Sequence, residues 1–96
     1  MSIYKYQIVP ATTPAVLAPG AATTLMKVVV YSATDVLKVE FKNGTTDTGD
    51  VLLTLQGGDD TTSYEISFVD VGGLEFSTGC WVKPVGTGGI VHCWYE

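Results

Sequence analysis

Apolar and polar residues alternate with a period of two along much of the chain. The clearest case is the segment 36–42, where apolar residues alternate with charged ones: Leu37, Val39 and Phe41 with Lys38, Glu40 and Lys42. A period of two is typical of a β-strand with one face in a core and the other in solvent. We therefore expect 36–42 to be a half-buried antiparallel strand.

Further strand-like segments follow at intervals of about 10–12 residues, separated by turns rich in glycine, asparagine and aspartate. They span 1–9, 23–33, 51–56 and 61–71, and two more lie within 73–96. None of them has a convincing helical period. The spacing predicts an all-β fold, a single antiparallel β-sandwich of about seven or eight short strands, built as a jelly roll or as an immunoglobulin-like Greek key.

The N-terminal segment differs from the rest because it contains three closely spaced prolines, Pro10, Pro14 and Pro19. Proline fixes φ and has no N–H to donate to a sheet. We expect residues 1–20 to form either an edge strand with a proline-rich connector or an extended arm that reaches a neighbouring subunit. Residues 21–96 are expected to form the sandwich domain. The apolar side of the first strand, a candidate partner-binding set, consists of Tyr4, Tyr6 and Ile8.

The C-terminal stretch 73–96 holds both cysteines, both tryptophans and the only histidine. It is expected to be a hairpin closed by the turn 84–89 and apolar on both faces. If the turn closes with Lys83 opposite Ile90, the numbers of opposed residues sum to 173 (83 + 90) along the antiparallel pair. One face then joins the core, with Cys80, Val82, Val91, Cys93 and Tyr95. The other face collects Trp81, Ile90, His92 and Trp94.

This second face is the stronger functional candidate. Monomeric proteins seldom expose large apolar patches, and tryptophan is enriched at the centres of binding interfaces. One interpretation is an interface with a partner. The other is a patch covered by a loop or by the N-terminal segment of the same chain.

The two cysteines, Cys80 and Cys93, are directly opposed in the expected register. Opposed side chains lie about 4.5–5.5 Å apart at Cβ, which is within reach of a cross-strand disulfide. Two buried thiols are the simpler interpretation, because nothing in the sequence indicates an oxidising compartment. Zinc is not expected, since Cys80, His92 and Cys93 supply only three ligands and the adjacent two point to opposite faces.

Charge and composition narrow the classes of partner. Five basic residues against ten acidic ones give a net charge of −5, so neither nucleic acid nor a membrane surface is an expected partner. Hydrophobic residues make up 46% of the chain and charged residues 16%, where about a quarter charged is typical. This balance favours a surface partly covered by partners. No catalytic motif or phosphate-binding loop is present, so we expect neither an enzyme nor a bound cofactor or metal.

Four stretches carry a resemblance to a known class: LMKVVVYSA, VLKVEFKNGTTDTGDVLLTL, YEISFVDVGGLEFSTGCWV and IVHCWYE. Together they resemble small all-β virion proteins of tailed bacteriophages over residues 23–96. The shared pattern lies at 27–31, 39–45, 49–55, 76–79 and 91–95. Trp81, His92 and Trp94 depart from it, because small polar or aliphatic residues are usual there, and the N-terminal segment is not covered.

The resemblance implies a capsid decoration or cement protein with no enzymatic activity. Such a protein would bind the major capsid protein and neighbouring copies of itself, commonly as a trimer, on the capsid exterior after assembly in the host cytoplasm. Two alternatives remain open. One is another virion component, such as a head–tail or tail adaptor or a fibre module. The other is a carbohydrate-binding β-sandwich that stacks sugars on Trp81 and Trp94.

Overall fold

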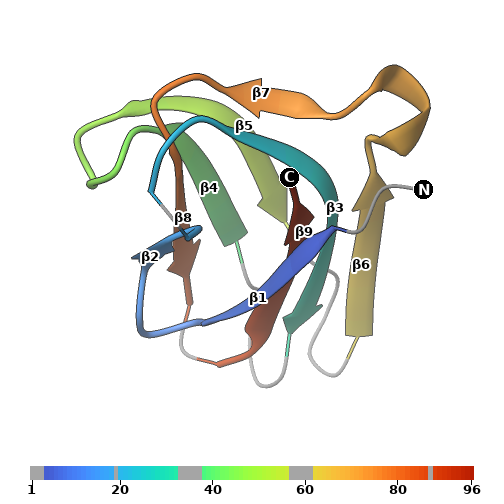
Figure 1. Cartoon of the computed structure of the whole chain (residues 1–96). Coiled ribbons are helices and arrows are strands. Elements are labelled where there is room, and N and C mark those ends of the chain that lie inside the picture. The colour runs from blue at the N-terminus through green and yellow to red at the C-terminus, as the bar shows by residue number, and fades with distance from the viewer. Residues whose placement is uncertain (1–3, 19, 33–37, 57–61, 87) are drawn as a thin grey trace.

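The computed structural model describes residues 4–18, 20–32, 38–56, 62–86 and 88–96. Within these ranges the chain is almost entirely β-strand, in two antiparallel sheets that pack face to face (Figure 1). The predicted all-β sandwich is confirmed. No helix in the described residues is long and apolar enough to cross a membrane.

Nine strands and one short 3-10 helix make up the described elements. In chain order they are β1 (Lys5–Pro10), β2 (Ala15–Val16), β3 (Thr23–Ser32), β4 (Lys38–Asn43), β5 (Asp50–Gln56), β6 (Thr62–Ser67), η1 (Val69–Val71), β7 (Leu74–Phe76), β8 (Cys80–Val85) and β9 (Ile90–Tyr95). The first sheet has the order β1-β9-β3-β6, and β7 also pairs with β3. The second sheet has the order β2-β8-β4-β5.

The pairing follows a simple rule that identifies the topology. β4 pairs with β5, β3 with β6, β2 with β8 and β1 with β9, so the chain is one long antiparallel ribbon that folds back at the β4–β5 turn. The ribbon rolls up, and the pairs β3–β9 and β4–β8 join its successive turns. This is the strand order of a jelly roll, one of the two predicted architectures, with β7 as an addition.

The predicted C-terminal hairpin is wrong. β8 pairs with β2 and β4 in the second sheet, whereas β9 pairs with β1 and β3 in the first, so the link between them crosses from one sheet to the other. Cys80 lies opposite Asn43, and Cys93 lies between Gln7 and Val28. Two consecutive strands with a glycine-rich link resemble a hairpin in sequence. In the rolled ribbon, however, each of them pairs with strands from the first half of the chain instead of with the other.

The N-terminal segment belongs to the sandwich. β1 pairs with β9 from Lys5 to Pro10, and Val9 and Leu17 are fully buried. Gln7 closes this side of the sandwich, because its Nε2 donates to the Val16 carbonyl at 3.2 Å and its Oε1 accepts from the Ala18 N–H at 3.1 Å. The described residues therefore form edge strands of their own domain and do not extend away from it as an arm.

The core lies between the inner faces of the two sheets. Its largest fully buried side chains are those of Phe41 and Phe76, from β4 and β7. The face assignment made for the last two strands is confirmed, since Cys80, Val82, Val91, Cys93 and Tyr95 are all buried. Period two therefore identified the inward side of each strand although the partner strands were misassigned.

The β4–β5 turn, where the ribbon folds back, is held by an ion-pair cluster. Nζ of Lys42 lies 2.8 Å from Oδ1 of Asp47, and Nζ of Lys83 lies 3.2 Å from its Oδ2. Lys42 also donates to the Asp47 carbonyl at 2.9 Å, which explains how a lysine in the second sheet is nearly buried. Both lysines lower the pKa of the Asp47 carboxyl by hydrogen bonding to its charged form.

Candidate functional site

The outer face of the first sheet is the candidate site, and its residues fall into rows across the strands. In the order β1, β9, β3, β6, the rows are Tyr6, Trp94, Lys27 and Ser67; then Ile8, His92, Val29 and Glu65; then Pro10, Ile90, Tyr31 and Ser63. The intervening residues of β9 and β3 are buried, so these rows point outward. We call these twelve residues the aromatic face.

Three rings form a cluster at the centre of the aromatic face. The ring centroids of Tyr6 and Trp94 are 4.9 Å apart, those of Tyr6 and His92 are 5.9 Å apart, and those of His92 and Trp94 are 6.2 Å apart. The Tyr6 hydroxyl is hydrogen-bonded to Nδ1 of His92. These separations are those of interacting aromatic pairs, so the cluster is a preformed surface of ring faces and edges.

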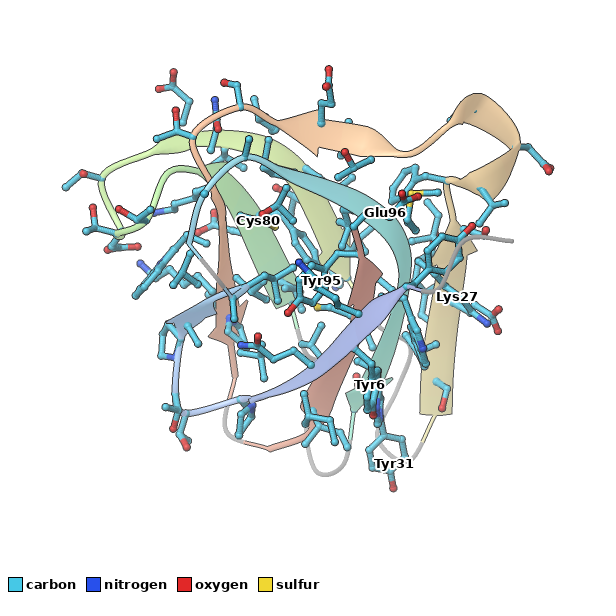
Figure 2. All side chains as sticks on the ribbon, viewed as in Figure 1. Tyr6, Lys27, Tyr31, Cys80, Tyr95 and Glu96 are labelled. Atoms are coloured by element: carbon cyan, nitrogen blue, oxygen red, sulfur yellow. The ribbon has the colours of Figure 1, made fainter. Side chains whose placement is uncertain are left out.

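Lys27 is the one cation of the aromatic face. Its Nζ lies 5.2 Å from the centroid of the Trp94 ring, a cation–π contact, and 2.9 Å from Oε1 of Glu65. Figure 2 shows Lys27 on the same sheet as Tyr6 and Tyr31. Lys27 and Glu65 cancel (+1 − 1 = 0), so the aromatic face is neutral while the whole chain carries −5.

The outer face of the second sheet has a different character. Its charged residues come from β4 and β8: Lys38, Glu40, Lys42 and Lys83. Solvated outer faces of antiparallel sheets are normally polar in this way, whereas the aromatic face is not. On the aromatic face, Tyr6 and Ile8 are 47% and 46% exposed, so large apolar side chains there are open to contact.

Trp81 does not belong to the aromatic face, contrary to the sequence-based prediction. It lies on β8 in the second sheet, between Val16 and Lys42, and it is half-buried with no hydrogen-bond partner for its buried Nε1 among the described residues. Trp81 and Trp94 therefore point out of opposite sides of the sandwich. A sugar platform that uses both tryptophans together is excluded by this placement.

The other predicted contact residues are largely brought together. Tyr6, Ile8, Ile90, His92 and Trp94 share the aromatic face, and half-buried Tyr4 comes just before β1. Residues of β3 were missed: Lys27, Val29 and Tyr31. Their signal was present, because they alternate with the buried Val28 and Val30, but only the tertiary pairing shows that β3 lies beside β9.

The cysteines are packing residues. Cys80 and Cys93 are free thiols, fully buried in the core on strands of different sheets. The possible cross-strand pair is not formed, and the favoured interpretation of two buried thiols is confirmed. Burial raises the pKa of Cys93 to about 12 and raises that of Cys80 as well, to which the nearby Cys93 adds. A thiol that stays protonated behaves as a small hydrophobic side chain.

The described residues contain neither a pocket nor a group of three or more His, Cys, Asp or Glu side chains placed to hold a metal ion. A comparison with protein-family models and with curated protein sequences finds no match to this chain. The aromatic face is thus the strongest candidate for a functional surface that the geometry provides, and its shape is that of an open sheet.

Proposed function

We propose that this protein is a capsid-associated structural protein of the decoration type, which binds the major capsid protein through the aromatic face. The observation that carries the proposal is the neutral, aromatic outer surface of the first sheet on an otherwise acidic chain. Tyrosine and tryptophan are the residues that most often dominate binding energy, and charged residues are depleted at interface centres. The cluster of Tyr6, His92 and Trp94 has this composition.

The fold supports the same class of function by analogy. Jelly rolls are common in viral capsid proteins and in lectins, although a fold alone does not define a function. The resemblance of residues 23–96 to phage virion proteins favours the capsid over other partners. A protein that occupies many equivalent sites on one particle also needs only modest affinity at each contact, because multiple contacts raise the total avidity.

The test uses capsids assembled without this protein and measures binding of the purified chain. Wild type is expected to bind, and Trp94→Ala is expected to weaken binding about tenfold or more, as for an interface hot spot. Val85→Ala removes an exposed apolar side chain from the second sheet, outside the aromatic face, and is the control, because Val85 is 46% exposed. Failure of wild type to bind, or equal binding by Trp94→Ala, would refute the proposal.

The same reagents separate the decoration role from other virion roles. Labelled protein on intact particles should cover the capsid surface, whereas a head–tail adaptor or fibre module would label one vertex or the tail. Carbohydrate binding is the second candidate, and the observation that favours it is the exposed three-ring cluster, because sugars stack on such rings. A glycan array with wild type and Trp94→Ala would detect it as binding that the variant loses.

A further inference from the structure

The sandwich has two different sides. On one side the edge strands β1 and β2 are joined by the Gln7 side chain. On the other side β5 and β6 are the outermost strands of their sheets, and each has a partner on only one of its flanks in the described structure (Figure 1). An unpaired strand edge presents free N–H and C=O groups, and proteins usually guard it against pairing with another chain.

Of the four strands at the ends of the two sheet orders, three have features that disfavour such pairing. β1 contains Lys5 and Pro10, and β2 is only two residues long. β6 has Glu65 near its middle. Lysine, proline, shortness and a central charge all disfavour pairing of an edge with another strand.

β5 has fewer features that disfavour pairing of its edge with another strand. It is seven residues long, it has neither lysine nor proline, and its only charge, Asp50, is its first residue. A β-bulge at Leu52 breaks its register with β4, but from Leu53 to Gln56 the pairing is regular. The bulge leaves two consecutive apolar side chains exposed, Val51 at 46% and Leu52 at 45%.

We propose that two copies of this chain associate by antiparallel pairing of their β5 edges about a two-fold axis at Thr54. Thr54 then faces Thr54 of the second copy, Leu53 faces Leu55 and Leu52 faces Gln56. Opposed threonines and opposed leucines are favourable cross-strand pairs. The second sheets of the two copies join into one continuous sheet of eight strands (4 + 4).

The positions of the charged residues favour a second copy of the chain as the partner of β5, and they favour antiparallel over parallel pairing. In the antiparallel arrangement the two Asp50 carboxylates are eight residues apart along the ladder, or about 26 Å at about 3.3 Å per residue. A parallel arrangement would place them side by side. Self-pairing of β6 would bring its central Glu65 close to the same residue of the second copy, which is unfavourable. A two-fold axis also makes the edge its own complement, so no other chain is needed.

The experiment measures molar mass in solution by light scattering or sedimentation over a range of concentrations. Wild type is expected to be a dimer that dissociates on dilution. Thr54→Lys places two like charges on the axis and should give a monomer, as should Thr54→Glu. An equimolar mixture of the two variants should form a heterodimer, because the charges on the axis are then opposite.

The mixture keeps the test independent of folding, because variants that had failed to fold would not be rescued by each other. Thr12→Lys adds the same charge to an exposed turn and is the matched control, expected to remain dimeric. A wild-type monomer, a trimer, a dimer that survives Thr54→Lys, or a mixture that stays monomeric would overturn the proposal. The dimer proposal does not depend on the proposed capsid role, which is tested separately by the capsid binding of Trp94→Ala.

Discussion

Tyr6 and Trp94 lie directly opposite each other on β1 and β9, with ring centroids 4.9 Å apart and ring planes tilted by 37°. They come from the two ends of the chain. Their contact is therefore part of the pairing of β1 with β9, the strand pair furthest from the β4–β5 turn of the ribbon. It also forms the centre of the proposed binding surface. The same pair contributes to both stability and recognition.

This pairing predicts an energetic coupling that a double-mutant cycle can measure. In Tyr6→Ala, Trp94→Ala and the double variant, the free energies of unfolding should show a coupling of about 0.5–1 kcal/mol, as for aromatic cross-strand pairs. Denaturant titrations of the four proteins provide the values. Additive losses would show that the two rings do not interact in solution.

Phe41 tests the core rather than the surface. Its side chain is fully buried between the sheets, so Phe41→Ala should lower the free energy of unfolding by about 3–5 kcal/mol through lost burial and a residual cavity. Val85→Ala, at an exposed position, should change it by no more than about 0.5 kcal/mol. Equal effects of the two substitutions in urea titrations would contradict the assigned core.

Asp47 links the stability of the ribbon turn to pH. Hydrogen bonds from Lys42 and Lys83 lower its pKa below the ordinary 3.8, so folding favours the charged carboxylate. This contribution is fully present above pH 3.8 and is lost as the pH falls through the lower folded pKa. Asp47→Asn should therefore be less stable at neutral pH and should lose less stability on acidification. Glu75→Gln, which removes an exposed acid from β7, is the control for the loss of one negative charge.

The buried thiols predict the opposite dependence at alkaline pH. The pKa of Cys93 rises from 9.0 to about 12 in the fold, so the native state disfavours the thiolate. The resulting stability is fully present below pH 9.0 and is lost as the pH rises toward about 12. The double variant Cys80→Ala, Cys93→Ala should show a shallower loss over this range. Wild type measured over the same pH range is the reference, so the difference between the two slopes isolates the thiols.

Much of the inward–outward pattern was predictable from the sequence, and the strand partners were not. Val39 and Phe41 alternate with charged residues, and Val91 and Cys93 alternate with His92, so each inward face could be assigned. A period of two contains no information about which strand lies alongside. That choice depends on how the whole ribbon rolls up, and a local, glycine-linked hairpin was the wrong solution for β8 and β9.

The same limit explains the errors at the candidate site. Trp81 and Trp94 share a face if their strands form a hairpin, but they face opposite ways when the strands lie in different sheets of one sandwich. His92 and Trp94 were identified because large aromatic residues at outward positions are unusual. Tyr31 and Lys27 were not, because an outward tyrosine or lysine in a strand is ordinary until its neighbours are known.

The rolled ribbon has a consequence for the synthesis of the protein. β9 is synthesised after the other eight described strands, yet it lies between β1 and β3, and the Glu96 N–H and carbonyl both bond to Thr24 at 2.9 Å. Until β9 leaves the ribosome, β1 lacks its neighbour in the first sheet and β3 is unpaired along the edge that β9 occupies. β1 must therefore wait for β9, and the domain can complete its fold only after β9 has emerged from the ribosome.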